Sequence, residues 1–265
     1  MGPSSSREWN AADYHRVSQP QLSWGKKVLA RLRLRGDETV LDAGCGSGRL
    51  TAELLEALPK GHVVGVDLSS NMLNIAREHL QPRFEGRVEF IACDLLHLPF
   101  ENSFDGIVST AAFHWVLDHD DLFQNLRRAL RAGGWLEAQC GGAGNLARLR
   151  ERMKLLAALP KYAPFLGGYP EPWLFQDAEN AATALRRAGF VEIETGLEPA
   201  LTVFEGREAY VEFLKTVVVR TYLGRLPDPE LQAQYLSDLA DQAAHDDPPF
   251  ALDYWRLNLS AKTPA

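Results

Sequence analysis

The sequence has few cysteines, and they form no pattern. It contains three, Cys45, Cys93 and Cys140, in 265 residues, and no Cys-x-x-Cys pair occurs. An odd and widely spaced set disfavours both a disulfide framework and a zinc knuckle, and no metal site is expected. This usage is typical of a reducing compartment, so we expect a cytoplasmic protein.

Long apolar runs and an excess of positive charge are also missing. No stretch approaches the roughly 18 apolar residues that a membrane-spanning helix needs, and Met1–Ser6 lacks the apolar core of a secretion signal. The net charge is −7, and we interpret basic clusters such as Arg148–Lys154 as solvated helix faces. Neither a membrane nor a nucleic acid partner is expected, since binding nucleic acid usually requires a basic surface.

What the sequence does contain is a glycine-rich turn. The apolar pair Val40–Leu41 leads into Asp42, and after Ala43 three glycines alternate with small residues, at Gly44, Gly46 and Gly48. Leucines at helical spacing follow, at Leu50, Leu54 and Leu58. Strand, glycine turn and helix are the first unit of a nucleotide-binding α/β sheet.

The spacing of the glycines indicates which nucleotide. A dinucleotide loop, G-x-G-x-x-G, would need its third glycine at the place of Arg49 or Thr51, and no Gly-Lys-Ser/Thr follows, so a phosphate-binding P-loop is also excluded. An acid two residues before G-x-G-x-G resembles the S-adenosyl-L-methionine (SAM) loop of class I methyltransferases. Because SAM has no pyrophosphate, Asp42 can face its cationic aminopropyl end.

The rest of the chain predicts further strands that alternate with helical stretches. We expect strands over His62–Val66, Val88–Ala92, Phe104–Ser109, Trp135–Cys140, Phe190–Glu194 and Tyr254–Ala261. This pattern predicts an α/β fold with a Rossmann-like, seven-stranded and mostly parallel sheet. We divide this single domain into an N-terminal helical segment (1–35), a SAM-binding core (36–142), and the remaining strands with a helical cap inserted before the last one (143–265).

Acidic residues follow two of the expected strands. Asp67 ends the second strand, where a carboxylate can accept hydrogen bonds from both ribose hydroxyls of a nucleotide. The alternative is a charge at the helix N-terminus beside Ser69, worth at most about 1 kcal/mol. Asp94 ends the third strand and can accept from an adenine amino group, while the backbone amide of Leu95 can reach a ring nitrogen.

The segment 109–119 is the most distinctive after the glycine loop. Small residues from Ser109 onward let the backbone approach the methionine part of SAM, and His114 and Trp115 follow where a methyl acceptor would lie. The alternative is that Trp115 is a core residue and His114 its polar neighbour. A carboxylate acceptor needs only donors, whereas a hydroxyl or carbon acceptor needs a base. His114 is the candidate base, with His119 and Tyr14 behind it.

Four motifs, at 40–48, 63–72, 92–100 and 111–116, resemble the successive motifs of class I SAM-dependent methyltransferases. The last is similar to the branch that contains trans-aconitate, malonyl-carrier-protein and juvenile hormone acid methyltransferases. The resemblance spans nearly the whole chain, strongly to about residue 142. It implies SAM contacts, with S-adenosyl-L-homocysteine as product, at Asp42, Ala43, Gly44, Gly46, Gly48, Asp67, Leu68, Met72, Asp94, Leu95 and Ser109.

The same resemblance implies an acceptor pocket that uses Tyr14, Gln21 and Trp115, and methylation of a small organic acid on its carboxylate. The chain departs from the branch at 145–185 and 196–250, so the identity of the acceptor does not transfer. We expect the aromatic stretch 162–175 and the helices of 207–245 to roof the pocket. Alternatives are hydroxyl or carbon methylation with His114 as base, and a SAM-binding regulator without turnover. Monomer and homodimer remain open.

Overall fold

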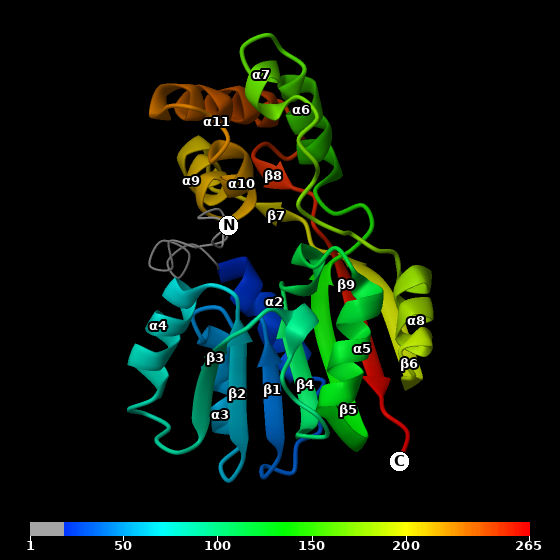
Figure 1. Ribbon diagram of the computed structural model, residues 1–265. Coiled ribbons are helices and arrows are strands. Elements are labelled where there is room, and N and C mark those ends of the chain that lie inside the picture. The colour runs from blue at the N-terminus through cyan, green and yellow to red at the C-terminus, as the bar shows by residue number, and fades with distance from the viewer. Residues whose placement is uncertain (1–18) are drawn as a thin grey trace.

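The computed structural model describes residues 19–265 and is organised around one seven-stranded sheet (Figure 1). The strand order is β3-β2-β1-β4-β5-β9-β6. The strands are β1 (Thr39–Ala43), β2 (His62–Asp67), β3 (Val88–Ala92), β4 (Phe104–Thr110), β5 (Leu130–Gly141), β6 (Val191–Pro199) and β9 (Trp255–Lys262). The first five pair in parallel, and β9 runs antiparallel to both of its neighbours, β5 and β6. The predicted seven-stranded, mostly parallel sheet is confirmed.

Helices cover both faces of the sheet because its strands are apolar on both sides. Along β1, Val40 packs into one hydrophobic cluster and Leu41 into the other, as the alternation of side chains in a strand requires. The first cluster joins helices α2 (Gln19–Leu29), α3 (Arg49–Ala57) and α4 (Ser70–Leu80). The second joins η2 (Leu95–His97), α5 (His119–Ala129) and α8 (Ala178–Arg187).

Side-chain caps fix where several of these helices begin. The Ser69 hydroxyl accepts from the Met72 amide at the start of α4. Asp118 and Asp177 cap α5 and α8 in the same way. Each cap satisfies one of the backbone N–H groups that a helix leaves unpaired at its N-terminus. The caps at Ser69 and Asp118 lie in the connections that follow β2 and β4, at the sheet edge where the functional residues lie.

The elements around the sheet have defined ends. Helix α2 ends at Leu29. Gly133–Gly134 lies inside β5, which begins at Leu130, directly after α5 ends at Ala129. The strand expected over Phe190–Glu194 runs on to Pro199 along β9.

A helical cap lies over one end of the sheet (Figure 1). It consists of α6 (Ala147–Ala157), α7 (Ala163–Leu166), α9 (Arg207–Phe213), the π-helical turn η4 (Leu214–Val218), α10 (Arg220–Leu223) and α11 (Pro229–Ala243), with the small antiparallel pair β7 (Thr202–Val203) and β8 (Ala251–Leu252). The cap has its own hydrophobic core, which includes Tyr162, Tyr210 and Tyr235. We expected one insertion before the last strand. The cap is built from two, because α6 and α7 follow β5 directly. Within residues 19–265, no helix is long and apolar enough to cross a membrane.

Close backbone packing at Gly61 fixes the register of β1 and β2. The Glu38 carbonyl oxygen accepts from the His62 amide at 3.0 Å, and a Cβ on Gly61 would lie 2.5 Å from that oxygen. We therefore expect Gly61→Ala to lower the free energy of unfolding by about 1–3 kcal/mol. Urea denaturation measures this change.

Gly196→Ala provides the matched control, because a Cβ on Gly196 in β6 would meet no atom within 4 Å. We expect its free energy of unfolding to stay within about 0.5 kcal/mol of the parent. Equal losses in the two variants would contradict the proposed role of Gly61.

Candidate active site

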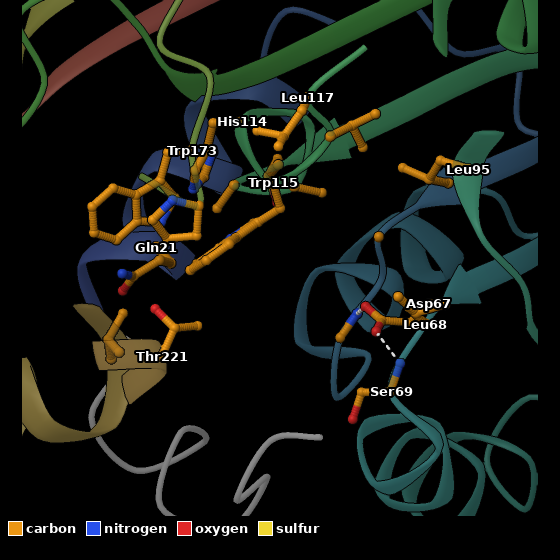
Figure 2. Close-up of a pocket in the computed structure, with 18 of the residues that line it drawn as sticks. Gln21, Asp67, Leu68, Ser69, Leu95, His114, Trp115, Leu117, Trp173 and Thr221 are labelled. Atoms are coloured by element: carbon orange, nitrogen blue, oxygen red, sulfur yellow. Dashed lines mark hydrogen bonds between the residues drawn. The ribbon is translucent and has the colours of Figure 1, made fainter. Parts of the chain in front are cut away.

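A cavity of about 660 Å³ lies between the carboxyl ends of the parallel strands and the cap. Its size falls within the range of roughly 300–1,000 Å³ that is typical of small-molecule and cofactor sites. Figure 2 shows Asp67, Leu68, Ser69 and Leu95 on one side, Gln21, Trp173 and Thr221 on the other, and Trp115 between them. We call these the loop side and the cap side.

The glycine loop forms part of the loop side. The amides of Gly44 and Cys45 both donate to the Val66 carbonyl, at 2.8 and 3.0 Å, which turns the loop back over the end of β2. A Cβ on Gly44, whose φ is +84°, would lie 2.3 Å from the Cβ of Ala112. Gly46 has φ +54° and open space around it. The small residues predicted at Gly44 and Ala112 are therefore needed for the two loops to meet.

Asp67 connects the glycine loop to the next helix. Its Oδ2 accepts from the Gly46 amide at 2.9 Å and its Oδ1 accepts from the Ser69 amide at 2.8 Å (Figure 2). The carboxylate still lines the cavity. A carboxylate oxygen can accept more than one hydrogen bond, so Asp67 can hold the loop and also accept from a ligand hydroxyl.

The predicted cofactor residues divide into two groups. Seven of them line the cavity: Gly44, Gly46, Asp67, Leu68, Met72, Asp94 and Leu95. The other four lie beneath the loop and support it: Asp42, Ala43, Gly48 and Ser109. The Ser109 hydroxyl donates to the Ala43 carbonyl at 2.6 Å. A Cβ on Gly48 would lie 2.7 Å from the Leu80 side chain, so this glycine permits close packing of α3 on α4.

Asp42 is buried and does not line the cavity, with an exposed fraction of 2%. Its Oδ2 accepts a 2.7 Å hydrogen bond from the Thr51 hydroxyl in the first turn of α3. Burial raises the pKa of this carboxyl to about 6, the Thr51 hydrogen bond opposes the rise, and the charge of Asp67 adds to it. Direct contact between Asp42 and a ligand stays a prediction. The carboxylate of Asp42 nevertheless places a negative charge beneath the glycine loop when it is ionised.

Asp94 occupies the wall next to Asp67. Its carboxylate accepts from the Leu96 amide at 3.0 Å and caps the short helix η2, which places Leu95 at the cavity surface. Asp94 can therefore cap η2 and also contact a ligand in the cavity.

His114 and Trp115 lie on η3 (Phe113–Trp115), and both line the cavity. The Nδ1 of His114 accepts from the Gly141 amide at 3.3 Å, and the His114 carbonyl accepts from the Leu174 amide at 2.9 Å. Because Nδ1 is the acceptor, the neutral ring carries its proton on Nε2. Burial lowers the pKa of His114 well below its usual 6.5, and the positive charge of Arg256 lowers it further. His114 is thus a neutral imidazole.

The alternative base His119 does not reach the cavity. It is buried, and its Nε2 lies 3.0 Å from the Phe113 carbonyl. Gln21 on α2 does line the cavity. Tyr14 lies outside the described residues.

Two arginines on the cavity wall were missed by the sequence analysis, Arg220 and Arg256. Arg256 on β9 is 3% exposed; its guanidinium lies over the Trp24 ring at 4.4 Å, and its Nε donates to Gln139 Oε1 at 3.4 Å. Arg220 begins α10 in the cap. No local sequence pattern marks either arginine, because each reaches the cavity only through tertiary packing.

An aromatic wall completes the cap side. Tyr169, Trp173 and Phe175 come from the aromatic stretch expected to roof the pocket, and all three line the cavity. The rings of Trp173 and Phe175 are stacked, with centroids 5.7 Å apart, and Trp115 meets Trp173 edge-on at 5.8 Å. Their placement agrees with the expected roof.

The π-helical turn η4 brings cap residues to the same wall. Val217 and Val218 end this turn, and Arg220 and Thr221 follow it; all four line the cavity. A π-turn widens the helix by one residue per turn and is frequent at functional sites. Hydrophobic periodicity does not predict it. In residues 19–265, no cluster of three or more histidine, cysteine or acidic side chains is placed to hold a metal ion.

The family model of a methyltransferase domain matches residues 40–134. A trans-aconitate 2-methyltransferase of Deinococcus radiodurans is 31% identical over 227 residues, which cover 82% of this chain and 83% of that protein. The chain belongs to the class I SAM-dependent methyltransferases. SAM is therefore the cofactor of this methyltransferase.

Two further comparisons agree with this assignment. A malonyl-[acyl-carrier protein] O-methyltransferase of Geobacter sulfurreducens is 29% identical over 211 residues, 78% of this chain and 76% of that protein. The solved structure of phosphoethanolamine N-methyltransferase 2 from Haemonchus contortus, in complex with S-adenosyl-L-methionine, has a TM-score of 0.65 at 20% identity. It covers all of this methyltransferase, which spans 61% of that chain, and it supports the fold.

The loop side fits this cofactor. The space above Gly46 is open, and two carboxylates, Asp67 and Asp94, border it. The buried Asp42 adds negative charge below. This arrangement suits a ligand with hydroxyl and amino donors and a positive charge.

We expect the affinity for SAM to rise with pH through the titration of Asp42. Its raised pKa of about 6 means that the folded protein keeps this carboxyl protonated and neutral up to that pH, and negative above it. A cationic ligand is favoured by the ionised form, so the dissociation constant should fall about 5-fold or more between about pH 5 and pH 7 and then level off. Calorimetric titration across this range measures it.

Variants of Asp42 and of its hydrogen-bond donor Thr51 provide the controls. Asp42→Asn should give a nearly flat profile. Thr51→Val removes the hydrogen bond that lowers the pKa of Asp42, so the transition should move to higher pH. Identical profiles for the parent and Asp42→Asn would rule out this coupling.

Proposed function

We propose that this methyltransferase transfers the methyl group of SAM to a carboxylate oxygen of a small organic acid. The observation that carries the proposal is the charge of the cap side. Arg220 and Arg256 line it, and His114 presents a neutral ring with its Nε2 proton. The trans-aconitate and malonyl-[acyl-carrier protein] relatives support the same acceptor class by their names.

An anionic acceptor suits this wall. Guanidinium groups form charge-assisted hydrogen bonds with carboxylates, which are about twice as strong as neutral ones. The acids that line the cavity are Asp67, Asp94 and Asp118, and the first two lie on the loop side. A carboxylate is therefore attracted to the cap side and repelled from the loop side, which orients it across the cavity.

The chemistry needs no base for such an acceptor. When bound, SAM supplies a methyl group on a sulfonium leaving group. A carboxylate is already ionised near neutral pH, because an unperturbed carboxyl group has a pKa of about 4. The Gln21 amide and the Trp115 indole can hold it, and the aromatic wall excludes water. Positioning of this kind contributes on the order of 7–11 kcal/mol at best.

The base-dependent alternative fits the site less well. A base at Nε2 of His114 would require the proton to sit on Nδ1, where the ring accepts from the Gly141 amide. Its lowered pKa also makes the ring a weaker base. His114 is better suited to donate a hydrogen bond to a carboxylate than to remove a proton from a hydroxyl group.

Methylation of matched acceptors tests the proposal. The protein is incubated with SAM and a panel of small carboxylic acids, with the corresponding primary alcohols and amides as controls. Release of S-adenosylhomocysteine and formation of the ester are followed by mass spectrometry. We expect methyl esters from at least one class of acids and no ethers. Methylation of alcohols alone would overturn the carboxylate proposal.

The role of His114 generates a second prediction. His114→Ala should lower kcat/KM for an accepted acid by about 10–100-fold, because a donor to the carboxylate is lost, and His114→Gln should recover part of the loss. Since His114 is already neutral and the acid already ionised, kcat/KM of the parent for the acid, measured at saturating SAM, should be flat between about pH 6 and pH 8.

His245→Ala is the matched control for these variants, because His245 is exposed and lies outside the cavity lining. Steady-state kinetics across the pH range measures all of them. A rise of kcat/KM with pH near 7 that disappears in His114→Gln would instead identify His114 as a base.

A further inference from the structure

Two buried oxygen atoms on the cap side have no hydrogen-bond partner within residues 19–265. They are Oε1 of Gln21 and Oγ1 of Thr221, and both residues line the cavity. Leaving a buried polar group unsatisfied costs about 1–3 kcal/mol. Because both residues line one cavity, a ligand bound there can supply the missing partner.

The two atoms come from separate parts of the chain. Gln21 lies on α2, which packs against the sheet, and Thr221 lies on α10, directly after the π-turn η4. Figure 2 shows the Gln21 amide and the Thr221 hydroxyl pointing toward one another, beside Trp173 and away from Asp67. This pair of polar atoms therefore belongs to the acceptor rather than to the loop side.

We propose that the acceptor carries a hydroxyl group, distinct from the methylated carboxylate, that bridges Gln21 and Thr221. This proposal rests on the proposed function. A hydroxyl group donates to Gln21 Oε1 and accepts from the Thr221 hydroxyl at the same time. It satisfies the pair in either orientation of the Gln21 amide, because a hydroxyl is both donor and acceptor.

Other ligand groups fit this pair less well. A carbonyl or a second carboxylate only accepts, so it pairs with Gln21 only if the amide turns its Nε2 toward it, whereas the atom that lacks a partner is Oε1. An ammonium group only donates, and it would enter a wall that already carries the positive charges of Arg220 and Arg256. A hydroxyl group is neutral and avoids this repulsion.

The residues around Gln21 and Thr221 indicate the chemistry of the rest of the acceptor. Trp173, Val217 and Val218 line the cavity beside it, and all three are at least nine-tenths buried. These side chains contact apolar or aromatic groups. The acceptor class is thus a hydroxylated carboxylic acid with a largely apolar body.

Matched pairs of acids test the inference. The probes are octanoic acid with omega-hydroxyoctanoic acid, shorter and longer members of that series, and phenylpropanoic acid with its para-hydroxy derivative. A site built around a ligand hydroxyl rejects the analogue that lacks it, so kcat/KM should favour the hydroxylated member of at least one pair by about 10-fold or more. A kcat/KM ratio near one for every pair of acids would overturn the inference. A bound water would then be the partner of Gln21 and Thr221.

Variants of the pair separate a hydrogen bond from general packing. Thr221→Val and Gln21→Met keep the volume and remove the polar atoms, so each should bring the selectivity ratio close to one. The ratio compares two acids on the same variant, so a general loss of turnover cancels in it. Thr221→Ser should preserve the ratio. Thr216→Val is the matched control on the same cap segment, because Thr216 lies outside the cavity lining. An unchanged ratio in both Thr221→Val and Gln21→Met would also overturn the inference.

Binding without turnover distinguishes this inference from the proposed function. The same pairs of acids are titrated by calorimetry into the protein saturated with S-adenosylhomocysteine. The dissociation constants of the two members of each pair then give the preference for the hydroxyl group directly. Preferential binding of the hydroxy acids without ester formation would reject the carboxylate reaction and support the hydroxyl site. Ester formation with no preference in binding or turnover would reject the hydroxyl site alone.

Discussion

The carboxylate of Asp67 is the contact on which the loop side of the cavity depends. One oxygen holds the glycine loop through Gly46, and the other holds the start of α4 through Ser69. Two backbone segments that follow different strands are thereby fixed to one side chain. Asp67 also lines the cavity, so the side chain that shapes the loop is placed to contact a ligand there.

The cap supplies a chemically different surface. It brings aromatic rings and an arginine over the strand ends, and β9 adds a second arginine from below. Asp67 and Asp94 border the loop side, and the two arginines lie on the cap side. The cationic cofactor and an anionic acceptor would be attracted to opposite sides of the cavity by this separation of charge, before any specific contact forms.

The fold and the loop side could be predicted from the sequence because their signals are local. Strand, glycine turn, helix and terminal acid lie within a few residues of one another, and Asp67 and Asp94 do reach the cavity. The local pattern does not show how Asp42 is held, because the hydroxyl of Thr51, nine residues later, keeps its carboxylate beneath the loop. Arg220, Thr221 and Arg256 were missed, since a π-turn and the pairing of the last strand bring them to the cavity.

The position of β9 in the sheet has a consequence for how the protein is made. This last strand lies between β5 and β6 and pairs with both, so β6 gains a neighbour in the sheet only when the C-terminal end of the chain arrives. The same strand carries Arg256. A nascent chain can therefore complete the glycine loop early, through contacts of short sequence separation, whereas its acceptor surface waits for contacts between distant residues, which form slowly. We therefore expect the cofactor half of the cavity to form during synthesis before the half that selects the acceptor.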